Sequence, residues 1–101
     1  MNINDKNIRQ EVFESDIPVV LDFYSDTCMP CKMLSPVLDD LGKLYKDKLK
    51  ICKLNVNENS QLADEYGVMA VPTLMYVKNG REINRTIGFI NKNEILEHLN
   101  L

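Results

Sequence analysis

Short apolar runs alternate with stretches of helical periodicity along this chain. The run PVVLDFYS, residues 18 to 25, is nearly continuous, and LKICKLNV, residues 49 to 56, has the same character. Continuous apolar runs of this length are typical of central parallel strands that are buried on both faces. Between the two runs, from about residue 30 to 46, apolar side chains recur at helical spacing, at Leu34, Val37, Leu38, Leu41, Leu44 and Tyr45. The pattern therefore predicts two parallel strands joined by a helix.

Proline and glycine mark where the helices begin, bend and end. Pro30 suits the first position of the long helix, where a missing backbone N–H costs nothing. Pro36 lies further inside and predicts a kink, because proline removes one backbone donor and its ring clashes with the preceding turn. A short helix is expected near residues 59 to 66, and Gly67 is placed to end it.

The last third of the chain predicts a hairpin and a helix. The segments TLMYV and EINRTIG flank Lys-Asn-Gly-Arg at residues 78 to 81, and Asn-Gly between apolar strands is the strongest short signal for a hairpin. These two strands are therefore expected to be antiparallel. The final helix starts at Asn91 as its cap, with Glu94 three residues later as the reciprocal partner and Ile90 placed to pack on Ile95.

The beginning of the chain has a weaker pattern. Residues 4 to 14 predict a helix capped by Asn4, with Ile8, Val12 and Phe13 facing inward, so only MNI remains for a first strand. The complete order is (β)αβαβαββα, an α/β protein with one central mixed sheet and helices on both faces. No repeat, low-complexity segment or linker interrupts this order, so we expect a single domain over residues 1–101.

Composition and charge exclude several classes of function. A chain of 101 residues with 45% hydrophobic and 27% charged residues is an ordinary globular composition. Its net charge of -3 provides no basic surface for nucleic acid or an anionic membrane. The chain lacks both a basic, apolar leader and the run of ~18 apolar residues that a membrane span needs. We therefore expect a cytoplasmic protein and, because no large apolar patch is indicated, a monomer.

Two cysteines three positions apart, in SDTCMPCKM at residues 25 to 33, carry the candidate chemistry. Positions three apart in a helical turn are about 5 to 6 Å apart at Cβ, which is compatible with a disulfide. Cys28 precedes the helix, where free backbone N–H groups and the helix dipole stabilise a thiolate, so it is the expected nucleophile. Cys31 lies one turn inside the helix and is the expected resolving thiol.

Asp22 is a second informative residue, because it interrupts a buried strand. A buried carboxyl group is costly when ionised, so desolvation is expected to raise its pKa towards the range in which it exchanges protons. Its position six residues before Cys28 allows it to lie beneath the sulfur atoms and to accept the proton of Cys31. Lys53, in the neighbouring strand, is its expected charge partner.

Four segments together resemble the thioredoxin family, in order and spacing, across nearly the whole chain. They are VVLDFYSDTCMPCKMLSPVLDDL, KLNVNEN, YGVMAVPTLMYVKNGRE and IGFI. The resemblance implies the thioredoxin fold and thiol-disulfide exchange, with Cys28 as nucleophile, Cys31 as resolving thiol and Asp22 as buried proton acceptor. The combination is far more specific than the cysteine pair alone.

The resemblance also implies a substrate groove opposite the cysteines. Pro72, after Val71, is expected to be a cis-proline that faces the pair, so that the backbone of Val71 pairs with an extended substrate segment. Gly88 is expected to complete this groove, where a side chain would block the substrate. The expected substrate-binding residues are Thr27, Met29, Pro30, Val71, Pro72 and Gly88.

The residues between the cysteines bear on the direction of exchange. Met29 stands where the family commonly has glycine, and Met29-Pro30 supplies no cation that would make the pair strongly oxidising. We therefore expect a protein-disulfide reductase, without a bound cofactor, that acts on disulfide-containing proteins and is re-reduced by a thioredoxin reductase-type electron donor.

Several alternatives stay open at this point. A zinc site needs four ligands, and the chain offers only Cys52 and His98 beyond the pair, so no metal is expected. An incidental pair of buried thiols is a second alternative. Within the same fold, a disulfide oxidase or isomerase and a non-enzymatic binding subunit are the remaining ones.

Overall fold

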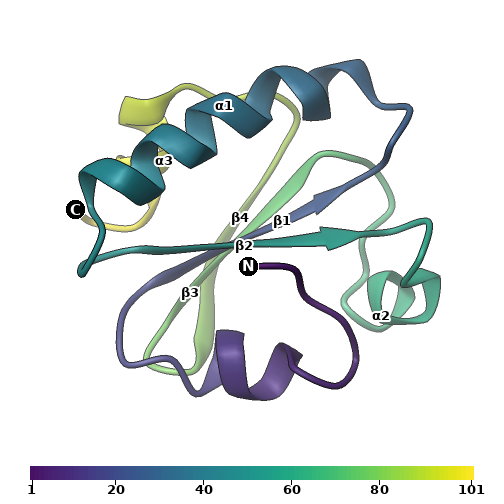
Figure 1. Cartoon of the computed structure of the whole chain (residues 1–101), viewed down its shortest axis with the longest axis horizontal. Coiled ribbons are helices and arrows are strands. Elements are labelled where there is room, and N and C mark those ends of the chain that lie inside the picture. The colour runs from purple at the N-terminus through teal and green to yellow at the C-terminus, as the bar shows by residue number, and fades with distance from the viewer.

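Four strands form one mixed sheet in the computed structural model, which describes residues 1–101 (Figure 1). The strands are β1 (Val19–Tyr24), β2 (Lys50–Asn55), β3 (Thr73–Lys78) and β4 (Arg81–Ile87), and their order across the sheet is β2-β1-β3-β4. β1 and β2 are parallel, whereas β3 is antiparallel to both β1 and β4. The predicted mixed sheet is therefore confirmed.

Helices cover both faces of this sheet. α1 (Met29–Leu44) and α3 (Lys92–His98) lie on one face, and the short η1 (Arg9–Phe13) and α2 (Ser60–Glu65) lie on the other (Figure 1). Because successive side chains of a strand alternate between the two faces, β1 contributes to both cores. Val20 packs with α1 and α3, while Val19, Leu21 and Phe23 pack with η1 and α2. The sheet is thus the middle of three layers.

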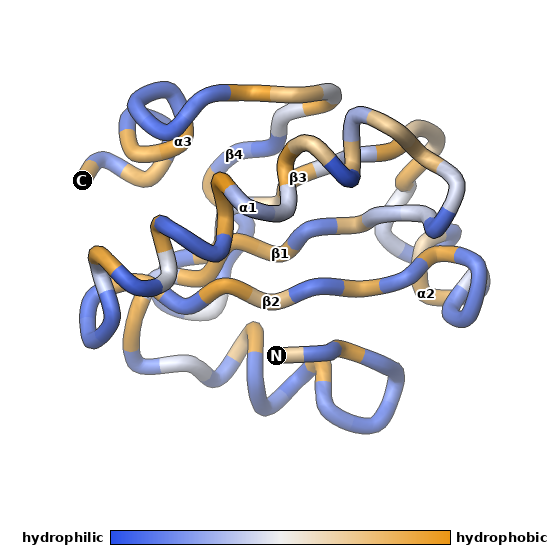
Figure 2. The backbone as a smooth tube through the Cα atoms, turned by 45° about the horizontal axis from the view of Figure 1, so that its top comes forward, coloured by the Kyte–Doolittle hydropathy of each residue, from blue (hydrophilic) through white to orange (hydrophobic).

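α1 has the buried side that its sequence periodicity predicts. Leu34, Leu38 and Leu41 are fully buried, and the alternating colours along α1 in Figure 2 reflect its polar outer side. Pro30 lies in the first turn, and the helix runs without interruption through Pro36. The prediction for Leu44 is wrong: this side chain is 69% exposed, because at about 100° per residue it lies to one side of the buried row of leucines on α1.

The first strand is reduced to a single bridge beside β2. Asn2 pairs with Lys53 in parallel, and the Ile3 N–H donates to the Lys53 carbonyl oxygen at 2.8 Å. The Lys53 N–H in turn donates to the Met1 carbonyl oxygen at 2.9 Å. β2 is an edge strand of the sheet, and these bonds give its Lys53 N–H and carbonyl groups hydrogen-bond partners on the outer side.

The predicted helix over residues 4 to 14 is only partly correct. Its regular part is the π-helical turn η1, while residues 5 to 7 form a turn. The Asn4 side chain accepts from the Lys6 N–H at 2.8 Å and so stabilises that turn instead of capping a helix. Ile8 and Val12 are buried as expected, and Phe13 is partly buried against the same core.

Both C-terminal turns form as their residues predict. Asn79 and Gly80 have φ values of 54° and 78°, which suit the tight hairpin between β3 and β4. A Cβ atom on Gly80 would lie 2.9 Å from the Phe13 carbonyl oxygen, so this position also requires glycine for space. At the start of α3, the Asn91 side chain accepts from the Glu94 N–H at 3.0 Å, and its amide donates to Glu94 Oε1.

Candidate redox site

The cysteine pair lies where β1 leads into α1. Cys28 and Cys31 form a disulfide with a Cα–Cα distance of 5.2 Å. Cys28 is the N-cap of α1, and its Sγ atom accepts from the Cys31 N–H at 3.2 Å. Pro30 in the first turn leaves one fewer N–H group to satisfy there. Cys28 is half-buried and Cys31 is buried, so the first sulfur is the more accessible one.

A second segment approaches the pair, and a third is hydrogen-bonded to that second segment. The Val71–Pro72 bond is cis, as expected, and the Val71 carbonyl oxygen lies 3.7 Å from Cys28 Sγ. The Gly88 N–H donates to the Pro72 carbonyl oxygen at 2.8 Å, which joins the end of β4 to this loop. Gly88 has a φ of 91°, and a Cβ atom there would meet no atom within 4 Å. The space in front of Gly88 is therefore open.

Asp22 lies on the α1 side of β1 and is almost completely buried, at 1% exposed. Its Oδ1 atom has no hydrogen-bond partner. Burial raises the pKa of this carboxyl group from 3.8 to about 7, and the charge of Lys53 opposes part of that rise. Asp22 is thus poised to gain or lose a proton near neutral pH.

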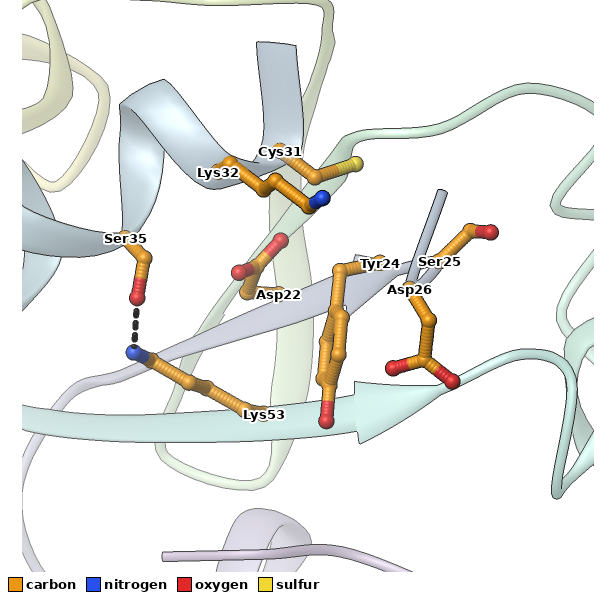
Figure 3. Close-up of a pocket in the computed structure, with 8 residues that line it drawn as sticks. All are labelled: Asp22, Tyr24, Ser25, Asp26, Cys31, Lys32, Ser35 and Lys53. Atoms are coloured by element: carbon orange, nitrogen blue, oxygen red, sulfur yellow. Dashed lines mark hydrogen bonds between the residues drawn. The ribbon is translucent and has the colours of Figure 1, made fainter. Parts of the chain in front are cut away.

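Lys53 acts on Asp22 through its charge, as expected, but no hydrogen bond or salt bridge joins the two side chains. The two residues are neighbours in the register of β1 and β2. However, the Lys53 ammonium donates to Ser35 Oγ at 2.7 Å and to Asp39 Oδ1 at 2.9 Å, both on α1. Figure 3 shows the lysine side chain directed to Ser35 and away from the Asp22 carboxylate. The Asp39 side chain stays in contact with solvent, so binding the cation there costs less desolvation than binding it beside the buried Asp22.

A pocket of about 270 Å³ brings Asp22 and Cys31 together (Figure 3). It opens between α1 and the ends of β1 and β2. Most of its lining residues have polar or charged side chains, although carbon atoms make up most of its surface, so a water molecule inside it has groups to bond that could connect the carboxyl group to the thiol. The lining residues are Asp22, Tyr24, Ser25, Asp26, Cys31, Lys32, Ser35 and Lys53.

Sequence reasoning missed Ser35 and Asp39, although a signal was available. They lie four and eight residues after Cys31, and residues four apart share one side of a helix. Tyr24, Ser25 and Asp26 were also missed as lining residues, because their place beside the pocket depends on how the loop after β1 turns.

Comparison with known proteins agrees with this geometry. The family model described as Thioredoxin matches residues 1–101. Over 99 residues the chain is 42% identical to the thioredoxin of Rickettsia felis, covering 98% of this chain and 94% of that protein. It is 38% identical over 97 residues to thioredoxin 1 of a Nostoc species, with 96% and 91% covered. The chain belongs to the thioredoxin family.

Family membership confirms the expected fold and activity. The chain is a thiol-disulfide oxidoreductase of the protein-disulfide reductase type. Thioredoxins need no bound cofactor, because the cysteine pair itself is oxidised and reduced. The incidental pair of buried thiols is thereby ruled out.

Beside the pair, this member of the thioredoxin family exposes apolar side chains. Met29 is 65% exposed and adjoins Cys28, while Thr27 and Pro30 are also exposed. Met69, two residues before Val71, is 97% exposed. The chain has no tryptophan, so methionine provides much of the apolar surface at this thioredoxin site.

The third cysteine and the histidine lie apart from the pair. Cys52 is buried in β2, and burial raises the pKa of its thiol. His98 stacks on Tyr76, and its Nδ1 atom contacts the side-chain amide of Asn84 at 2.5 Å.

No group of three or more His, Cys, Asp and Glu side chains is arranged to hold a metal ion. No helix has the length and apolar run needed to cross a membrane.

Proposed function

We propose that Cys28 is the nucleophile and Cys31 the resolving thiol in the reduction of protein disulfides. The observation that carries this assignment is the position of Cys28 as the N-cap of α1, half-exposed, with a backbone N–H directed at its sulfur. N–H groups and the dipole at a helix start stabilise a thiolate. Cys31 is buried one turn later, out of reach of a protein substrate but beside Cys28.

The proposed cycle has two exchange steps and a re-reduction. The Cys28 thiolate attacks one sulfur of the substrate disulfide, forms a mixed disulfide and releases the other substrate sulfur as a thiolate. The Cys31 thiolate then attacks Cys28 Sγ, forms the Cys28–Cys31 disulfide and releases the second substrate thiolate. Two electrons pass from the cysteine pair to the substrate. A thioredoxin reductase-type donor returns them.

In this proposal Asp22 accepts the proton that Cys31 must lose before it attacks. A pKa of about 7 suits a group that takes up and releases protons near neutral pH. Both residues line the same pocket, which supports transfer through water between them. Lys53 lines the same pocket, and its positive charge favours the ionised form of Asp22 and so limits the rise of the Asp22 pKa.

We further propose that the substrate lies along the surface formed by Thr27, Met29, Pro30, Val71, Pro72 and Gly88. An extended substrate segment would pair with the backbone of Val71, as a short version of strand addition. The 3.7 Å distance between the Val71 carbonyl oxygen and Cys28 Sγ supports this place for the substrate sulfur. The open space in front of Gly88 supports the path of the segment.

The direction of exchange is tested by measuring the potential of the pair. The protein is equilibrated in dithiol and glutathione buffers, and the Cys28–Cys31 couple is quantified by thiol labelling. We expect a value more negative than about −200 mV, together with catalytic reduction of a protein disulfide. A value near about −120 mV would instead indicate a disulfide oxidase. Unchanged function in cells of the double Cys→Ser variant would indicate a binding subunit.

Met29 is predicted to determine which partners react fast, without stabilising the fold. Its side chain is 65% exposed at the rim, so Met29→Ala should change the kcat/KM for a protein substrate or for the reductase several-fold. The free energy of unfolding should change by less than about 0.5 kcal/mol. Met33→Ala is the matched control, since Met33 is 57% exposed on the same helix. A large loss of stability with unchanged kinetics would show that Met29 is a packing residue.

The partners in this proposal are disulfide-containing proteins and the reductase-type donor. A monomeric state, a cytoplasmic location and a single domain over residues 1–101 stay predictions.

A further inference from the structure

Lys53 is held by two side chains of α1 that have no role in the exchange steps. Ser35 Oγ accepts from the Lys53 ammonium at 2.7 Å, and Asp39 Oδ1 accepts at 2.9 Å. The lysine side chain is 21% exposed and that of Asp39 is 57% exposed, so this contact lies at the protein surface. The buried Asp22, next to Lys53 in the sheet, receives no such contact.

The arrangement follows from the spacing along α1 and the register of the strands. Cys31, Ser35 and Asp39 are each four residues apart and therefore lie along one side of the helix. That side faces Lys53 on β2, whose register partner on β1 is Asp22. Cys31, Asp22 and Ser35 therefore line the same pocket as Lys53. Asp39 lies one helical turn beyond Ser35 and does not line it.

We propose that Ser35 and Asp39 form a clamp that keeps the Lys53 ammonium away from the Asp22 carboxyl group and thereby sets the pH range in which Asp22 accepts the proton of Cys31. Ser35 and Asp39 are positioning residues, because they act through Lys53. The inference rests on the role proposed above for Asp22.

The physical basis is the distance dependence of charge interactions. A cation close to a carboxyl group favours its ionised form, and the effect weakens as the two separate. Releasing Lys53 from the clamp would bring its charge nearer to Asp22 and make the carboxyl group a weaker base. The other ionisable residues that line the pocket, Tyr24, Asp26 and Lys32, are left unchanged by this release.

The first test measures the titration of Asp22 itself. The carboxyl group is followed by carbon NMR in the disulfide form, so that neither thiol of the pair titrates. Asp39→Asn should lower the pKa of Asp22 by about half a unit, as expected for a partly exposed ion pair. Ser35→Ala should lower it in the same direction without changing any charge. Lys53→Met should raise it.

Asp40→Asn is the matched control for the loss of a negative charge. Asp40 lies next to Asp39 on α1, its side chain is 58% exposed, and its ion-pair partner is Lys92. This variant should leave the Asp22 pKa within about 0.1 unit of the wild type, because its charge is screened by solvent. In a Lys53→Met background, Asp39→Asn should also change the Asp22 pKa by no more than about 0.1 unit, because no lysine is left to be released. A shift that persists in that background, or no shift in either clamp variant, would overturn the clamp.

The second test measures the step that the clamp should control. A mixed disulfide on Cys28 is prepared, and its release by Cys31 is followed against pH. In Asp39→Asn and Ser35→Ala the midpoint of this profile should move down together with the Asp22 pKa. If the Asp22 pKa moves while the release profile does not, the clamp is supported and the proton-accepting role of Asp22 is overturned. If Asp22→Asn abolishes the pH dependence but the clamp variants leave both quantities unchanged, only the clamp is overturned.

Discussion

Replacing Cys28 with serine is expected to lower the rate of protein-disulfide reduction by at least about a thousandfold, down to the assay background. A hydroxyl group forms no mixed disulfide, so Cys31 is left with no bond to resolve. The buried position of Cys31 also prevents it from replacing Cys28 as the attacking thiol. The measurement is the rate at which a dithiol donor reduces a protein disulfide, compared between the wild-type protein, the variant and an assay without either protein.

Cys31→Ser should have a different effect, which identifies the role of each sulfur. The nucleophile remains, so a substrate disulfide should trap the variant as a mixed disulfide with Cys28, visible as an added mass that a reducing agent removes. Cys52→Ser is the matched control, because this third cysteine is buried in β2 away from the site. It should keep its activity and trap nothing. Full activity of Cys28→Ser, or a mixed disulfide trapped through Cys31 in that variant, would contradict the proposed cycle.

Asp22→Asn is expected to stabilise the fold at high pH. The folded-state pKa of Asp22 is about 7, against 3.8 for the unperturbed group. Between these two values the folded state holds a proton that the unfolded state has lost, so stability decreases as pH rises from about 4 to about 7. The full difference corresponds to about 4 kcal/mol. We expect the variant to gain about 2 to 4 kcal/mol in the free energy of unfolding at pH 8.5 and less than about 1 kcal/mol at pH 4.

This gain is measured by urea unfolding of the disulfide form across that pH range. Asp40→Asn, which removes an exposed carboxylate, should follow the wild-type curve within about 0.5 kcal/mol. An equal effect of Asp22→Asn at both ends of the pH range would show that packing, and not ionisation, sets the cost of this residue. The wild type would then keep an ionised carboxylate in a buried site, contrary to its nearly complete burial.

The order of the elements follows from the sequence, because each depends on residues within a few positions. The apolar runs of β1 and β2, the periodicity of α1 and the Asn-Gly turn at residues 79 and 80 all act locally, and all appear in the structure. The errors lie where the local pattern is weak. Asn4 bonds within a turn because residues 5 to 7 are all polar and give a helix no side to bury, and Leu44 lies beside the buried row of leucines on α1 and not in it.

The approach of Val71 to Cys28 and the hydrogen bond between Gly88 and Pro72 could be predicted only from the resemblance to a family. Cys28, Val71 and Gly88 come from segments far apart in the chain, and no periodicity links them. The sheet brings them together, because the start of β3 and the end of β4 lie beside the end of β1 that leads into α1. Recognising the order and spacing of several segments therefore predicted contacts that pattern alone does not.

The sequence by itself determined the helix-start position of Cys28 and the buried position of Asp22, since both depend on neighbouring residues. Only the tertiary structure decided what Lys53 contacts. Strand register makes this lysine a neighbour of Asp22, but its long side chain reaches across to α1, where Ser35 and Asp39 accept its hydrogen bonds. The physical reason is that a flexible cation binds the best available acceptors, and which acceptors are within reach depends on how α1 lies over the sheet.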